Sequence, residues 1–242
     1  HPVIQERFGL IAEAARMVAS PQIRNSGTMG GNVVQDTRCW YYRFGLACYR
    51  AGGNTCYASA PEAMNREHAI FGASRCVAVS PSDPAPALVA LAAEMVIRNS
   101  GGERVVSAED FFMTPAVDIQ RMTVLHPEDL LTTIRIPDTW AGANFYFEKV
   151  ADRGSWDFPL VNVASALRIE GGQIADARIV VGAVACVPRR LRDVEDFVRG
   201  RVQNEETANM AGAMAIEGAE PLRYNGFKVP LMENLVKRAV RD

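Results

Sequence analysis

Residues 19–32 read ASPQIRNSGTMGGN, and this stretch decides how the rest of the chain is interpreted. It ends in Thr28-Met29-Gly30-Gly31-Asn32, where two adjacent glycines let the backbone come close to a ligand because no Cβ intervenes. Successive backbone N–H groups in such a turn can form a nest for a phosphate. Thr28 and Asn32 add side-chain hydrogen-bonding groups. The G-x-G-x-x-G spacing of a Rossmann fingerprint is absent, and an ordinary tight turn remains the alternative.

The composition is that of a globular protein, with 242 residues, 48% of them hydrophobic, and a net charge of −2. This is enough apolar material for one large core or two small ones. A slightly acidic chain gives no basic surface that would indicate nucleic-acid binding. The longest apolar runs, such as residues 85–93, reach only about half of the ~20 residues that a membrane span needs. We therefore expect neither nucleic acid nor a membrane span.

The periodicity predicts an α+β chain in two units, residues 1–138 and 139–242. In the first unit we expect an amphipathic helix over residues 5–19, which stops near Pro21, and a buried helix over residues 84–94. A hairpin of residues 95–98 and 104–106 and a further strand over residues 130–136 complete this unit. In the second unit we expect a strand over residues 144–150 and a hairpin of residues 161–169 and 174–184. Three helices are expected after the hairpin, over residues 189–199, 205–217 and 228–240.

Residues 36–78 lack periodicity, and a long stretch of this kind is uncommon in a compact domain unless it is functional. Four of the five cysteines lie in it, at C-x8-C-x7-C-x19-C spacing: Cys39, Cys48, Cys56 and Cys76. Without a tight C-x2-C pair, a zinc finger or ribbon is disfavoured. Four thiolates from one loop could still bind zinc or a [4Fe-4S] cluster, and unrelated buried thiols are the third alternative. His68 in this loop is more often a hydrogen-bonding residue than a ligand, and Cys186 reads as a buried hydrophobic residue.

Four segments, in the same order, resemble the FAD-binding subunits of the molybdenum hydroxylases, the xanthine dehydrogenase and carbon monoxide dehydrogenase family. Residues 19–32 resemble the second flavin motif of that family. Residues 80–88, SPSDPAPAL, resemble the segment whose aspartate contacts the flavin. Residues 129–137 resemble the strand that edges the isoalloxazine, and residues 147–150, FEKV, resemble the lysine strand that opens the C-terminal domain. The resemblance covers essentially the whole chain.

This resemblance implies a fold and a set of flavin contacts. Residues 1–138 correspond to the second subdomain of a PCMH-type (vanillyl-alcohol-oxidase-like) FAD-binding domain. A carbon monoxide dehydrogenase flavoprotein C-terminal-like α+β domain follows over residues 139–242. The family's earlier glycine-rich pyrophosphate motif has no counterpart here, so we expect the first subdomain to be missing or supplied by another chain. The implied cofactor-binding residues are Thr28, Met29, Gly30, Gly31 and Asn32 at the pyrophosphate and ribityl end, Asp83 as a hydrogen-bond partner of the flavin, and Leu131 and Lys149 near its ring.

The cysteine loop narrows the resemblance to a subset of these subunits. RCWYY at residues 38–42 and NREHAIFG at residues 65–72 are similar to an insertion in the flavin subunit of bacterial periplasmic aldehyde oxidoreductase. In that subset four loop cysteines hold an additional [4Fe-4S] cluster. The resemblance therefore implies Cys39, Cys48, Cys56 and Cys76 as cluster ligands and weighs against zinc.

The function implied is that of an electron-transfer flavoprotein subunit without catalytic residues of its own. In such a heterotrimer, a large partner subunit oxidises the substrate at a molybdopterin centre, and a small partner carries two [2Fe-2S] clusters. Electrons would pass through FAD to an external acceptor. The compartment would be the cytoplasm, or the periplasm if the chain is exported with a partner subunit. Two alternatives remain: the β subunit of a 4-hydroxybenzoyl-CoA reductase-type enzyme, with electrons flowing in the opposite direction, and a zinc-binding interaction module.

Overall fold

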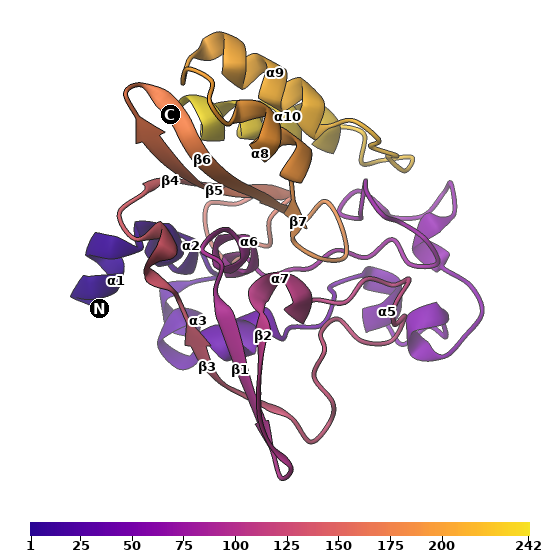
Figure 1. The fold of residues 1–242 in the computed structure, drawn as a ribbon. Helices are drawn as coiled ribbons and strands as arrows, with labels where there is room; N and C mark the ends of the chain where they lie inside the picture. Colours follow the sequence, from indigo (N-terminus) through magenta and orange to yellow (C-terminus); the bar gives the residue numbers. More distant parts are fainter.

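A four-stranded antiparallel sheet occupies the middle of the computed structural model, which describes residues 1–242. Its strand order is β4-β5-β6-β7, and helices cover both of its faces (Figure 1). The strands are β4 (Asn144–Val150), β5 (Val161–Glu170), β6 (Gln173–Gly182) and β7 (Arg189–Arg190). The helices on one face are α8 (Arg192–Val198), α9 (Glu205–Ala215) and α10 (Lys228–Arg241). The predicted strand, hairpin and three helices of the second unit are thus confirmed.

The two faces of this sheet belong to two different hydrophobic cores. Because side chains alternate along a strand, Val161 and Val163 of β5 point into the core shared with α8, α9 and α10. Ala164 and Ala166 point the other way, into a core that contains Leu88. The sheet of the second unit is therefore also the packing surface on which the first unit folds.

Two helices of the first unit, α2 (Gly9–Arg16) and α6 (Pro84–Ala90), cover the face of the sheet opposite α8, α9 and α10. Every residue of α6 is buried, as expected from its sequence. The expected single helix over residues 5–19 is wrong, because α1 (Pro2–Arg7) and α2 are separate helices. The chain leaves helical geometry at Phe8, with φ −138° and ψ 46°, and the Phe8 side chain is buried in the second core. Burial of that ring determines the path here more than helical periodicity does.

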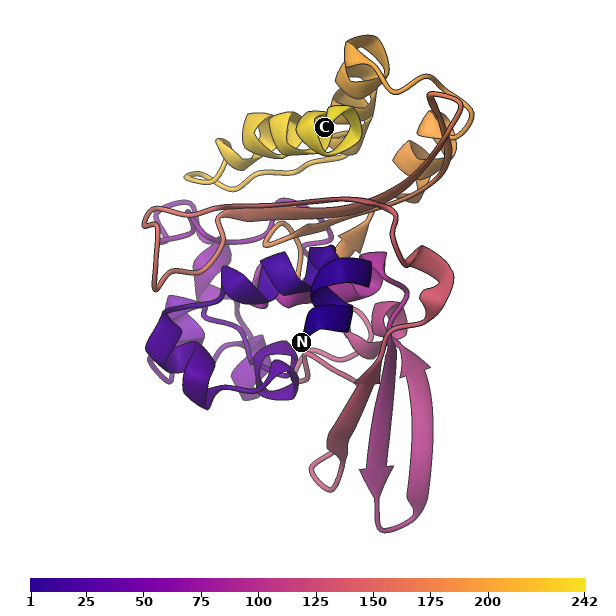
Figure 2. The same cartoon turned by 90° about the vertical axis from the view of Figure 1, so that its left-hand side faces the viewer.

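A three-stranded antiparallel sheet, in the order β2-β1-β3, projects away from these layers (Figure 2). It confirms the expected hairpin, whose register pairs Asn99 with Gly102 across the turn. Its strands are β1 (Glu94–Asn99), β2 (Gly102–Ser107) and β3 (Leu130–Arg135). The short helix α7 (Ala108–Phe111) follows β2, and η3 (Asp138–Trp140) follows β3. No helix combines the length and the apolar character needed to cross a membrane.

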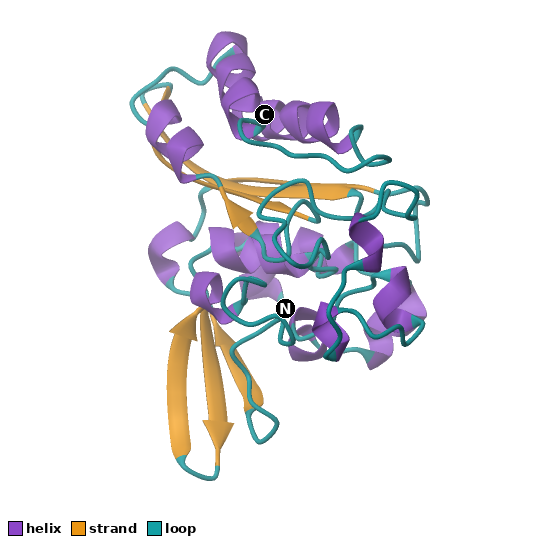
Figure 3. Ribbon diagram, turned by 90° about the vertical axis from the view of Figure 1, so that its right-hand side faces the viewer, coloured by secondary structure: helices purple, strands orange, loops and turns teal.

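The cysteine loop lies beside both layers and is mostly irregular, with three short helical turns (Figure 3). These are α5 (Trp40–Arg43), η1 (Tyr49–Ala51) and η2 (Tyr57–Ser59). Ile70 and Phe71 are buried in the core under α8, α9 and α10. The Asn225 side-chain amide donates to the carbonyls of His68 (3.0 Å) and Ala69 (3.2 Å). The second unit therefore holds the end of the loop in place.

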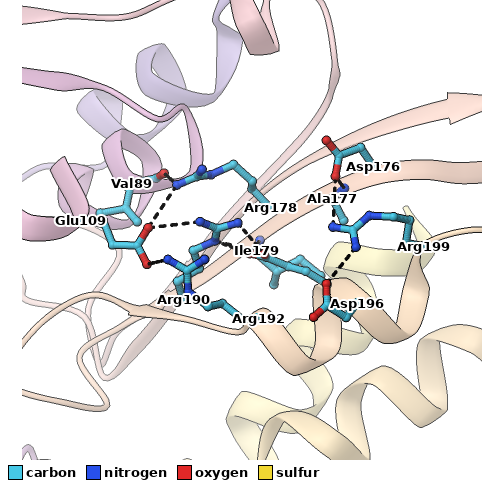
Figure 4. Close-up of polar contacts among 11 residues, drawn as sticks. Val89, Glu109, Asp176, Ala177, Arg178, Ile179, Arg190, Arg192, Asp196 and Arg199 are labelled. Atoms are coloured by element: carbon cyan, nitrogen blue, oxygen red, sulfur yellow. Dashed lines mark hydrogen bonds and ion pairs between the residues drawn. The ribbon is translucent and has the colours of Figure 1, made fainter. Parts of the chain in front are cut away.

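An arginine–glutamate network also joins the two units (Figure 4). The Glu109 carboxylate of α7 lies 3.1 Å from the Arg190 guanidinium and 2.7 Å from that of Arg192. Arg178 of β6 lies 3.6 Å from Glu109 and donates a 2.7 Å hydrogen bond to the Val89 carbonyl. Because Arg178 and Arg190 are largely buried, these contacts are less screened by solvent than surface ion pairs. The network fixes α6 and α7 against β6 and β7.

Candidate functional site

The glycine-rich segment forms two short helices rather than the expected turn. The first is α3 (Pro21–Ser26), where the Ser20 hydroxyl accepts from the Ile23 N–H at 3.4 Å. Pro21 therefore begins a helix instead of ending one, which suits its fixed φ at a first helical position. The second is α4 (Met29–Val33), capped by the Thr28 hydroxyl, which accepts from the Gly31 N–H at 2.9 Å. Serine and threonine caps satisfy backbone donors that have no partner within the helix, and this stabilises both short helices.

Five of the expected flavin-binding residues line one cavity of about 580 Å³. They are Thr28, Met29, Gly31, Asn32 and Asp83. The volume lies in the range of roughly 300–1,000 Å³ that is typical of small-molecule sites. Other parts of the wall come from α2, α3 and the segment after β4, which includes Trp156 and Phe158. The structure thus brings together segments that lie more than a hundred positions apart in the sequence.

Gly30, Leu131 and Lys149 do not line this cavity. Gly30 and Leu131 line a neighbouring cavity, to which Thr28 and Met29 also contribute. Lys149 is buried behind Asp83. Of the three, only Lys149 contacts a residue of the main cavity through a hydrogen bond or an ion pair.

Asp83 and Lys149 form a buried ion pair at the edge of the cavity. The Lys149 ammonium donates to one Asp83 carboxylate oxygen at 2.8 Å, and the two side chains are 5% and 4% exposed. It also donates to the carbonyls of Met17 (3.1 Å) and Asp157 (2.7 Å). The other Asp83 oxygen, Oδ1, is buried without a hydrogen-bond partner. Burial raises the pKa of Asp83 to about 6, while Lys149 acts in the opposite direction.

The Asp83 segment is also joined directly to α4. The Ser82 hydroxyl donates to the Asn32 side-chain oxygen at 2.7 Å. The Asn162 side chain donates to the Asp83 carbonyl at 3.3 Å. Asp83 is therefore positioned from the helix on one side and from the central sheet on the other. A buried acceptor held without a partner is costly, and a ligand N–H or O–H would satisfy it.

All four loop cysteines line one small cavity. Their spacing in the sequence alone could not show that they share it. The side walls include the aromatic rings of Tyr41, Tyr42 and Tyr57. Cys48 and Cys76 are buried, and Cys39 and Cys56 are partly exposed. No three of the His, Cys, Asp and Glu side chains lie at the spacing of ligands to a single metal ion. Thiols are the donor type of iron–sulfur clusters, in which each thiolate binds its own iron, so the donor set fits such a cluster.

Two further polar residues lie beside this cavity: Arg50, which sequence reasoning did not assign, and His68, which it read as a hydrogen-bonding residue. Arg50 lines the cavity with its side chain 1% exposed. The His68 Nε2 atom lies 3.2 Å from the Cys39 sulfur. Burial lowers the pKa of His68 to about 4, with a smaller contribution from Lys228, so the imidazole is neutral. The sequence offered no signal for Arg50, because the loop contains several arginines and only the fold shows which one is buried.

Gly53 is expected to be indispensable for the shape of this loop. A Cβ at that position would lie 1.8 Å from the Ala47 carbonyl oxygen and 3.2 Å from the Cys48 carbonyl oxygen. Because both neighbours are backbone atoms, we expect Gly53→Ala to destabilise the fold by about 1–3 kcal/mol and to displace Cys48. Thermal unfolding and iron content measure the two effects. Gly154→Ala is the control, since its Cβ would meet nothing within 4 Å, and equal behaviour of the two variants would contradict the expectation.

Family profiles match nearly the whole chain. The profile of the FAD binding domain in molybdopterin dehydrogenase matches residues 1–139. The profile of the CO dehydrogenase flavoprotein C-terminal domain matches residues 146–242. These two matches agree with the fold and the order of the two units that the resemblance implied.

Two relatives and one solved structure agree with these family matches. The chain is 31% identical to the aldehyde oxidoreductase FAD-binding subunit PaoB of Escherichia coli, over 100% of this chain and 73% of that protein. It is 27% identical to the carbon monoxide dehydrogenase medium chain of Hydrogenophaga pseudoflava, over 99% of this chain and 68% of the relative. A solved structure of carbon monoxide dehydrogenase from that organism superposes with a TM-score of 0.73 at 25% identity, again over 99% and 68% of the two chains.

Proposed function

The chain belongs to the FAD-binding subunits of the molybdenum hydroxylases, and we propose that it is the electron-transfer subunit of such an enzyme. In this proposal it holds FAD in the cavity beside α4 and passes electrons to an external acceptor. The observation that carries the proposal is that Thr28, Met29, Gly31, Asn32 and Asp83 line one cavity. Bound FAD would supply the exchange of electrons, so the residues of the chain bind, orient and shield it.

The flavin contacts divide into two groups. Thr28, Gly30, Gly31 and Asn32 would lie at the pyrophosphate and ribityl end, with Met29 in the same helix. The unpartnered Oδ1 atom of Asp83 would accept a hydrogen bond from the flavin. Leu131 would lie near the ring from the neighbouring cavity.

Lys149 has a different role in this proposal from a direct flavin ligand. Its ammonium group is engaged with Asp83 and two backbone carbonyls. It keeps Asp83 ionised against the effect of burial, and it adds a fixed positive charge close to the cavity. Such a charge would stabilise an anionic reduced flavin by simple Coulomb attraction.

We further propose that Cys39, Cys48, Cys56 and Cys76 hold a [4Fe-4S] cluster. Their shared cavity and the soft character of thiolate ligands support this assignment over a hard-ligand metal site. The proposed partners are a large molybdopterin-binding subunit and a small subunit with [2Fe-2S] clusters. Relatives named as medium chains of carbon monoxide dehydrogenase and glyceraldehyde dehydrogenase support an assembly of several subunits.

One purification tests the whole proposal. The complex containing this chain is isolated without oxygen, and its FAD, iron, zinc and molybdenum are counted per protomer. We expect flavin and iron in amounts that match one FAD and one additional cluster beyond those of the partner subunits. Zinc in place of iron would favour a zinc-binding interaction module. Oxidation assays with aldehydes and reduction assays with aromatic thioesters then separate an aldehyde oxidoreductase from a reductase of the 4-hydroxybenzoyl-CoA type.

The Asp83 carboxylate predicts a pH dependence of FAD retention. A carboxylate that accepts a hydrogen bond from the flavin has a lower pKa in the complex than in the free protein, where it is about 6. The free protein then binds more protons than the complex, so FAD affinity falls as the pH drops through about 6. Flavin fluorescence after equilibration between about pH 5 and pH 8 measures this.

The matched variant is Asp83→Asn, which keeps the shape of the side chain and removes its charge. It should bind FAD roughly 10- to 100-fold more weakly near neutral pH, as expected for a lost hydrogen bond to a charged group, and with a flat pH profile. Because Lys149 would be left buried without its partner, Asp83→Asn with Lys149→Met serves as a stability control. A wild-type pH profile in Asp83→Asn would contradict the role of Asp83.

A further inference from the structure

Arg50 lies between two of the cluster cysteines in the sequence and against the cysteine cavity in space. It belongs to η1, two residues after Cys48, and its side chain is 1% exposed. The Cys76 thiol lines the same cavity as Arg50. Arg50 is thus a buried cation at the wall of the proposed cluster site.

The protein supplies too little negative charge for this cation. The only carboxylate in ion-pair contact is that of Asp36, 3.8 Å from Nη1, with its side chain 36% exposed. The remaining partners are uncharged acceptors, the Gln120 carbonyl at 3.0 Å and the Cys186 sulfur at 3.6 Å. The Nε atom is buried with no hydrogen-bond partner. A guanidinium cannot lose its proton in a protein, so a buried one needs an anion beside it.

We propose that Arg50 is a positioning residue that compensates the negative charge of the iron–sulfur cluster and raises its reduction potential. The inference rests on the proposed cluster assignment. Four thiolates and the cluster give a net anion, and one-electron reduction makes it more negative by one unit. A fixed cation at the cavity wall stabilises the reduced state more than the oxidised state.

Charge and hydrogen bonding are the protein's means of tuning such a cluster, since the iron chemistry itself belongs to the cofactor. The Arg50 guanidinium also connects three parts of the chain through its contacts with Asp36, Gln120 and Cys186. A purely structural role would depend on the hydrogen-bonding geometry of the guanidinium, whereas the proposed role depends on its positive charge. The two roles therefore predict different behaviour for a lysine at this position.

The test is a redox titration of the complete complex with dithionite, in which dithionite supplies the electron and the EPR signal of the additional reduced cluster is followed. The variants are Arg50→Gln and Arg50→Lys. The control is Arg75→Gln, because Arg75 is exposed although it adjoins Cys76. At a fixed potential we expect the ratio of reduced to oxidised cluster in Arg50→Gln to fall about tenfold, a shift of about 59 mV to lower potential for one electron. Arg50→Lys should stay near the wild type, and Arg75→Gln should not shift.

A wild-type midpoint in a cluster-loaded Arg50→Gln complex would overturn the inference. If Arg50→Gln loses the cluster, the Arg50→Lys variant distinguishes charge compensation from a purely structural role. Retention of iron with a near-wild-type midpoint in the lysine variant supports charge compensation, and loss of iron in both variants assigns Arg50 a purely structural role. A wild-type complex without the additional cluster signal would instead refute the proposed cluster assignment.

Discussion

Replacing Cys48 with serine is expected to remove about four irons from each protomer of the complex, the content of one [4Fe-4S] cluster. A serine hydroxyl is a hard donor with a much higher pKa than a thiol, so it does not replace a thiolate at iron. Cys48 lies in the wall of the cavity that it shares with Cys39, Cys56 and Cys76. Serine at any of the other three positions should give the same loss. Iron content and the EPR signal of the reduced complex measure it.

Cys186→Ser is the matched control for this series. Cys186 is as buried as Cys48, at 4% and 8% exposure, but it does not line the cysteine cavity. Burial raises the pKa of the Cys186 thiol to about 12, which keeps it in the uncharged form. We expect this variant to keep its full iron content. Equal iron in the wild type and in Cys48→Ser would refute the cluster assignment, and iron loss in Cys186→Ser would show that the ligand set is wrong.

The regular elements were predictable where one residue pattern dominated. The alternation in residues 161–169 and 174–184 and the turn between them specify the β5–β6 hairpin, which the structure confirms. Helical periodicity failed at Phe8, because a ring buried by tertiary packing interrupts the helix. Pro21, expected to end a helix, begins α3 instead, and the glycine-rich segment expected to be a turn is α4, because the Ser20 and Thr28 caps start new helices there.

The site was only partly predictable for a related reason. A motif can indicate that Thr28 and Asp83 serve one ligand, but only the fold shows that both line one cavity and that Lys149 lies behind Asp83. The buried state of Arg50 depends on how an irregular loop packs. No period or spacing in the sequence encodes that packing, so a buried arginine could not be separated from exposed ones such as Arg75.

Replacing Gly31 with valine is expected to abolish FAD retention while the cysteine loop keeps its cluster. Gly31 lies inside α4 without a positive φ, so the need for glycine here is one of space and not of left-handed backbone geometry. A Cβ would lie 3.1 Å from the Thr28 hydroxyl, and the branches of valine would extend beyond it at the wall of the main cavity. The substitution should therefore both disturb the Thr28 cap and fill space that the cofactor needs.

Two variants separate these effects from general loss of stability. Gly31→Ala adds only the Cβ, so it should weaken FAD binding less than Gly31→Val does. Gly9→Val places the same branched side chain at the start of α2, where a Cβ meets nothing within 4 Å, and should retain FAD. FAD and iron are counted on each purified complex, with thermal unfolding as a check on folding. A folded Gly31→Val complex with full FAD occupancy would show that Gly31 does not line the FAD site, and the flavin would then have to be sought along the neighbouring cavity that Gly30 and Leu131 line.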